Sequence, residues 1–210
     1  GLGGIRDSIA DHLFPGTSTI QTRLRYMLFI PWLFQMLEGS AAGPDQLAIE
    51  ARALENRLAN ALKAGGESNG IIGRDAGADL QRLPSSVYWA GLGTWGIRLF
   101  PGSTDNLFSS MRHLQRNRPR VRESEDAASE AQALQIWTPA LPPRPKDILE
   151  AARFRLTPDE AQFIIDRLVA QQPRSLLAFL ARTGGGTADC RYIWEHPHLA
   201  DFPGDARSLV

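Results

Sequence analysis

The chain has 210 residues, 43% of them hydrophobic, which is enough for one domain or two small ones with a buried core. Lys plus Arg and Asp plus Glu both number 23, so the net charge is zero and the overall balance does not require a polyanionic partner. The single cysteine, Cys190, excludes an intramolecular disulfide and fits a reducing cytosol.

The N-terminal quarter of the chain predicts two helices. Apolar residues recur at four-residue intervals over residues 5–13, which indicates a first helix ended by a Pro-Gly turn. Ser18 and Gln21 have the spacing of a capping box, in which each side chain bonds the other residue's backbone. This pattern predicts a second helix over residues 19–37, kinked by Pro31.

The longest apolar run lies in that second helix, at residues 26–37. A membrane-spanning helix needs about 20 apolar residues, so this run predicts a buried helix instead. We therefore expect a cytoplasmic protein without a membrane partner. The sequence starts without methionine, from which we expect a piece of a longer polypeptide.

Helical signals continue through the middle of the chain, where an apolar stripe from Leu47 to Ala61 precedes a Gly-Gly stop. We predict helices over residues 45–63, 78–83, 87–95 and 103–115. Extended segments near Ile71 and Ile97 allow at most one short β-hairpin.

A proline-rich segment, residues 138–145, cannot form a continuous regular element and predicts a linker. It would separate an N-terminal helical lobe, residues 1–137, from a C-terminal helical lobe, residues 146–210. Thr157 followed by Pro158 and two acidic residues is the strongest helix start in the chain. The predicted fold is mainly α and multi-helical, in two lobes.

Aromatic residues of the N-terminal lobe are expected to form its interior. They are Phe29, Trp32, Trp89 and Trp95. If they lie together in a dry core, any contact with a charged partner falls to the arginines, which make up all but two of the 23 basic residues.

The predicted start of the second helix is a candidate anion site. Thr17, Ser18 and Thr19 would present free backbone amides there, with Arg23 and Arg25 within two turns. The alternative is that the capping box satisfies these amides itself and the arginines pair with nearby acids, and such caps are common.

A second group of arginines could follow a phosphate backbone. It comprises Arg112, Arg116, Arg118, Arg120 and Arg122. Four acidic residues follow within residues 123–130, so the alternative is a solvated connector whose charges compensate one another.

Residues 78–95 can also be threaded as a helix-turn-helix, with residues 97–100 starting a wing. However, residues 84–96 contain no lysine, arginine, asparagine or glutamine, which are the side chains that read bases. Apolar residues surround the second of these helices, so we expect it to be buried.

Signals for catalysis are weak. Arg191 and His196 fit the Arg-x4-His spacing of a helical ribonuclease superfamily, but so short a pattern is unspecific. Cys190, His196 and His198 could offer three metal ligands, without a clear fourth. We predict no catalytic residue, no metal and no cofactor, and we regard an enzyme as the less favoured alternative.

Several segments carry a resemblance to a known family. They are Ile5-Arg6-Asp7, LFPGTSTIQTR from Leu13, FIPW from Phe29, SSVYWAGL from Ser85, WGI from Trp95, FRLTPDEAQFI from Phe154 and SLLAFLA from Ser175. On these segments the chain resembles an uncharacterised bacterial family, the domain-of-unknown-function family six-three-six-one. The resemblance covers most of the chain and transfers no catalytic residue.

Members of that family resemble components of bacterial defence or mobile-element neighbourhoods, which implies a nucleic-acid-related role. The first hypothesis is therefore a non-catalytic module of a defence-type system that contacts the DNA or RNA backbone. The second is a scaffold that binds a protein encoded nearby, and the third is a helical ribonuclease.

Overall fold

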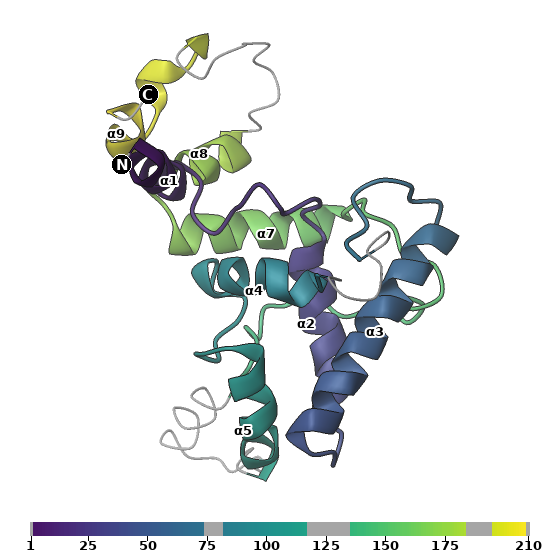
Figure 1. The fold of residues 1–210 in the computed structure, drawn as a ribbon. Helices are drawn as coiled ribbons and strands as arrows, with labels where there is room; N and C mark the ends of the chain where they lie inside the picture. The colour runs from purple at the N-terminus through teal and green to yellow at the C-terminus, as the bar shows by residue number, and fades with distance from the viewer. Residues whose placement is uncertain (1, 74–81, 117–134, 184–194, 209–210) are drawn as a thin grey trace, which may run out of the picture.

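The computed structural model describes residues 2–73, 82–116, 135–183 and 195–208 (Figure 1). Their α-helices are α1 (Leu2–Leu13), α2 (Tyr26–Leu37), α3 (Pro44–Ala64), α4 (Pro84–Thr94), α5 (Thr104–Arg116), α7 (Pro158–Gln171), α8 (Leu176–Thr183) and α9 (Gly204–Arg207). Over these ranges the one β-type contact is an isolated antiparallel bridge between Arg98 and Trp137. The mainly α prediction is confirmed. The segment at Ile97 pairs with the chain near Trp137, and Ile71 lies in no strand.

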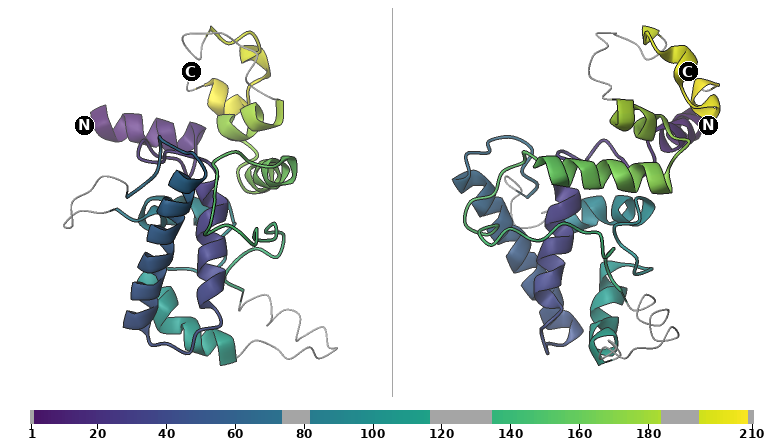
Figure 2. Two further views of the ribbon diagram at one scale, coloured as in Figure 1. Left: turned by 90° about the vertical axis from the view of Figure 1, so that its right-hand side faces the viewer. Right: turned by 180° about the vertical axis from the view of Figure 1, so that it is seen from behind.

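Helix α2 occupies the centre of the molecule. It lies between α3 and α4, and α7 crosses near its N-terminal end (Figures 1 and 2). Phe29 and Trp32 are 1% and 0% exposed, as expected for a helix with an apolar surface all round. None of the described helices is both long and apolar enough to cross a bilayer.

The predicted start of this helix at Thr19 is wrong, because α2 begins at Tyr26. No capping box forms at Ser18. Its carbonyl oxygen accepts a turn bond from the Gln21 amide at 3.1 Å, and the Gln21 side chain donates to the Gly16 carbonyl, also at 3.1 Å.

Contacts with α4 and with Trp95, the residue after it, fix the loop before α2 in a non-helical conformation. The Tyr88 hydroxyl accepts from the Arg23 amide at 2.9 Å and donates to the Arg23 carbonyl at 2.7 Å. The Trp95 indole donates to the Pro15 carbonyl at 2.8 Å. Gly91 has no Cβ, which lets the loop backbone approach α4 closely. These contacts link residues 65 or more positions apart, so the local sequence does not reveal them.

Apart from the one at residues 78–83, the remaining helix predictions agree with the structure to within a few residues. At α7, Thr157 Oγ1 accepts from the Glu160 amide and Glu160 Oε2 accepts from the Thr157 amide, which completes the capping box. The stripe from Leu47 to Ala61 on α3 is buried. Helix α4 buries Val87 and Leu92, as expected of an apolar helix. The predicted helix at 78–83, which would complete a helix-turn-helix, lies largely outside the described residues.

The main core surrounds α2 and crosses the proline-rich segment. Phe163 and Leu168 of α7 belong to the same buried cluster as Trp32, and the Trp32 indole donates to the Pro142 carbonyl at 2.8 Å. The division into two lobes stays a prediction. Of the four aromatic residues expected inside, Trp89 alone is only half-buried.

A second, smaller core joins the two ends of the described chain. Leu13 at the end of α1 packs with Leu176 and Phe179 of α8, and with Phe202 and Ala206 near α9. Figures 1 and 2 show α1, α8 and α9 together at one end of α7.

Candidate functional site

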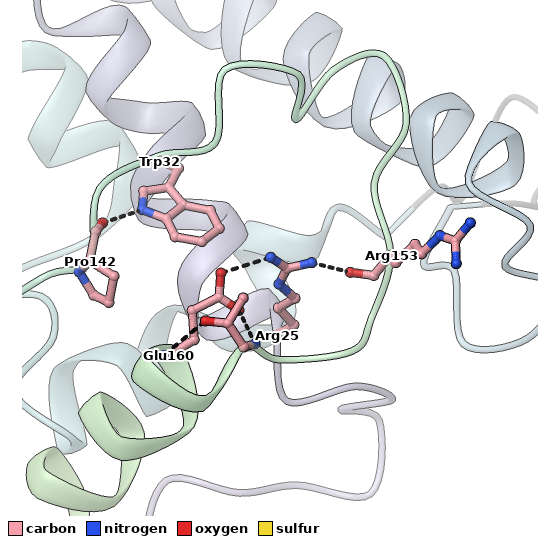
Figure 3. Close-up of polar contacts among 6 residues, drawn as sticks. Arg25, Trp32, Pro142, Arg153 and Glu160 are labelled. Atoms are coloured by element: carbon pink, nitrogen blue, oxygen red, sulfur yellow. Dashed lines mark hydrogen bonds and ion pairs between the residues drawn. The ribbon is translucent and has the colours of Figure 1, made fainter.

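Arg25 and Glu160 form a buried ion pair where α7 meets the start of α2 (Figure 3). Arg25 Nη2 lies 2.7 Å from Glu160 Oε1, and the two side chains are only 11% and 7% exposed. Arg25 Nη1 also donates to the Arg153 carbonyl at 2.7 Å. The guanidinium lies over the rings of Phe29 and Trp32, 5.2 and 6.0 Å from their centroids. This arrangement ties α2, α7 and the segment before α7 together.

The capping box of α7 positions the acid of this pair. Glu160 uses Oε2 for the Thr157 amide, which leaves Oε1 for Arg25. A single carboxylate therefore both caps α7 and neutralises the arginine that precedes α2.

Beside the pair lies a cavity of about 630 Å³. Its lining is mainly apolar and includes Phe29, Ile148 and Leu156 in addition to Arg25. Arg25 Nε is buried with no acceptor in the described part of the chain. Figure 3 shows the Arg153 side chain extending away from Arg25, so Arg153 contacts Arg25 through its backbone carbonyl and not through its side chain.

Arg25 was expected at the surface, and the structure places it inside. Because Glu160 matches its charge at close range, an incoming phosphate would meet a carboxylate of the same sign next to the guanidinium. Arg25 is therefore better suited to holding the fold together than to binding a free anion.

Three other arginines near this site face solvent. Arg23, Arg153 and Arg155 are exposed and have no ion-pair partner among the described residues. Arg23 Cζ lies 5.5 Å from the centroid of the Phe154 ring, which places it beside the chain segment that carries the other two. Two acids are close: Glu67 Oε1 accepts from the Phe154 amide at 2.7 Å, and Asp147 lines the same cavity as Arg153 and Arg155. Three arginines against these two acids leave the local charge positive.

The residues of the predicted anion site lie in the loop before α2. Thr17, Ser18 and Thr19 are exposed, and the Thr17 hydroxyl donates to the Phe14 carbonyl at 2.8 Å. Since no helix starts there, the helix dipole that motivated the site is missing.

The second arginine group lies elsewhere. Arg112 and Arg116 are exposed on α5, and Arg112 Nη2 donates to the Ala41 carbonyl at 2.9 Å, beyond the C-terminal end of α2. Helix α2, roughly 18 Å long at 1.5 Å per residue, separates them from Arg25. Arg118, Arg120 and Arg122 lie outside the described residues.

The candidate catalytic and metal-ligating residues are only partly described. Cys190 and Arg191 lie outside the described residues. His196 is 9% exposed, and its Nδ1 accepts from the His198 amide at 3.1 Å. Its ring packs 5.1 Å from that of Phe202. Across the described ranges no group of three metal-ligating side chains occurs.

Sequence reasoning missed Glu55, a buried carboxylate on α3. Its Oε1 accepts from the Ser85 amide at 2.6 Å and its Oε2 from the Ser85 hydroxyl at 3.1 Å. Burial raises the pKa of Glu55 to about 7, against the opposing effects of these hydrogen bonds and of Arg52. A signal was available, because Glu55 lies four residues after Ala51 and three before Leu58, on the apolar stripe.

Comparison with known proteins identifies the family of this chain and gives no information on its activity or partners. No curated protein and no solved structure matches the sequence. One family model, described as a family of unknown function (DUF6361), matches residues 1–201, nearly the whole chain. The chain therefore belongs to the DUF6361 family.

Proposed function

We propose that this chain is a non-catalytic module of a bacterial defence-type system and that it binds the nucleic-acid backbone. The binding claim rests on one observation, the three solvent-facing arginines without ion-pair partners gathered around Phe154. The defence-type setting rests on the family resemblance alone, and the binding claim can be tested without it.

Arginine suits this role because its planar guanidinium donates two parallel hydrogen bonds to a phosphate. The backbone of these arginines, Arg23, Arg153 and Arg155, is anchored by hydrogen bonds, since Arg25 donates to the Arg153 carbonyl and the Phe154 amide donates to Glu67. Tyr88 bonds both backbone groups of Arg23. The interface we propose therefore lies at these three side chains. It replaces the loop at residues 17–19.

Fluorescence anisotropy with labelled 20-nucleotide single-stranded DNA, single-stranded RNA and duplex DNA tests the proposal. We expect affinity to fall linearly with salt on logarithmic axes. The double variant Arg153→Gln, Arg155→Gln should bind more weakly and reduce the salt slope by about 2, one for each lost phosphate contact. Arg57→Gln, an exposed arginine on α3, is the matched control and should bind like the wild type. Absence of binding to all three probes at low salt would refute the proposal.

A protein-interaction scaffold is the second candidate. Ile20 and Leu24, 45% and 44% exposed, lie in the loop before α2 and give that surface an apolar character. A scaffold predicts that the chain co-purifies with a protein encoded nearby and that Ile20→Ser, Leu24→Ser abolishes this complex. Retention of the complex by the double variant would exclude this surface.

A further inference from the structure

A second cavity, of about 310 Å³, lies among helices α2, α3, α4 and α5. Its walls are largely apolar and include Phe34, Ile49 and Phe108. Glu55 and Ser85 line the same cavity. A polar acceptor therefore borders an apolar space large enough for an extended alkyl chain.

The two buried carboxylates of the described chain differ in their partners. Glu160 has Arg25 at 2.7 Å. Glu55 is 2% exposed and bonds only to the neutral amide and hydroxyl of Ser85, with no ion pair among the described residues. A buried carboxylate is normally paired with a cation or held neutral, so Glu55 lacks the partner that its charged form requires.

Each Glu55 oxygen also retains hydrogen-bonding capacity. A carboxylate offers about four lone-pair sites, and the bonds from Ser85 occupy two of them. An ammonium group carries three donors on one positive charge, which matches an acceptor that lacks a counter-ion.

We propose that this cavity binds a primary alkylammonium group, with the nitrogen at Glu55 and the alkyl chain along Phe34 and Phe108. The same chemistry is offered by a free aliphatic amine and by the side chain of a lysine in a polypeptide. The proposal is independent of nucleic-acid binding, because it uses none of the arginines assigned to that surface.

Two other titratable groups line the cavity, Arg52 and Asp105, and they carry opposite charges. Tyr26 lies outside the lining; burial raises the pKa of its hydroxyl to about 12, and the charge of Glu55 adds to this effect. Because only ionised Glu55 attracts the ammonium group and its pKa is about 7, the apparent affinity should rise roughly tenfold from pH 6 to pH 8.

Nuclear magnetic resonance on the whole chain tests the proposal. Titration of the ¹⁵N-labelled protein with n-butylammonium chloride at pH 8 should shift the Ser85 amide in a saturable way. Butan-1-ol, with the same chain and no charge, should bind at least tenfold more weakly. Equal shifts with butan-1-ol, or no saturable shift with n-butylammonium, would overturn the proposal. Both comparisons use the wild type, so neither depends on a variant that fails to fold.

Two variants locate the charge. Glu55→Gln should abolish the response to n-butylammonium, whereas Glu50→Gln should keep it. Glu50 is on the same helix and bonds Ser40 and Gln46 instead of lining the cavity. An unchanged response in a folded Glu55→Gln protein would contradict the assignment. A tripeptide with a central lysine, acetylated at its N-terminus and amidated at its C-terminus, distinguishes the two sources of the ammonium group. Tighter binding of this peptide than of n-butylammonium supports a lysine side chain in a polypeptide as the ligand, and weaker binding supports a free aliphatic amine.

Discussion

The substitution Glu55→Gln should make the stability of this protein less dependent on pH. Burial raises the pKa of Glu55 from its ordinary 4.5 to about 7, so the folded state holds a proton that the unfolded chain has already released between these values. The free energy of unfolding contributed by this group is therefore highest below pH 4.5 and is lost as the pH rises to 7. The difference corresponds to about 3 kcal/mol at 1.36 kcal/mol for each pKa unit.

Urea denaturation followed by circular dichroism from pH 4.5 to 8 measures this effect. Glutamine is neutral throughout, and its carbonyl can still accept from Ser85. The stability of the wild type minus that of the variant should therefore fall by about 3 kcal/mol over this range, and other titrating groups cancel in the difference. In thermal melts the same change amounts to roughly 6–12 °C for a chain of this size. Parallel curves for the two proteins would show that Glu55 titrates at its ordinary pKa, and the reasoning would fail.

Three further predictions concern contacts that hold α2 and α3 in place. Arg25→Met should destabilise the fold by about 3–5 kcal/mol, because it leaves the buried Glu160 carboxylate without its cation. In a double-mutant cycle, adding Glu160→Gln should restore part of that loss, and additive effects of the two substitutions would contradict the pairing. Gly65→Ala should lower the melting temperature, since its Cβ would overlap a backbone carbonyl, whereas Gly39→Ala, with open space around it, should leave the melting temperature nearly unchanged. Trp32→Phe keeps an aromatic ring but loses the indole donor that bonds the Pro142 carbonyl in the proline-rich segment. Urea titration should therefore show that the free energy of unfolding falls by at least about 1 kcal/mol. An unchanged urea midpoint would argue against that hydrogen bond.

Helices with signals inside their own sequence were predictable. The Thr157 capping box with Pro158 identifies the start of α7 because every partner lies within four residues. The stripe from Leu47 to Ala61 identifies α3 because one face of a helix repeats at a fixed interval. In both cases the determining contacts are local.

The start of α2 and the candidate site were not predictable in this way. The Tyr88 hydroxyl binds both backbone groups of Arg23 from 65 positions away and holds the loop that a capping pattern would have made helical. Arg25 finds Glu160 across 135 positions, so a residue expected at the surface became part of the interior. Long-range partners of this kind leave no periodic trace in the sequence.

The small core that joins α1 to α8 and α9 has a consequence for synthesis of the chain. Among the described residues, Leu13 finds its apolar core neighbours only at Leu176 and beyond, so about 160 further residues have to be translated before α1 can bury its apolar face. Until then that face is open to chaperones and to aggregation. At 5–20 residues per second, translation keeps it so for roughly 10–30 s.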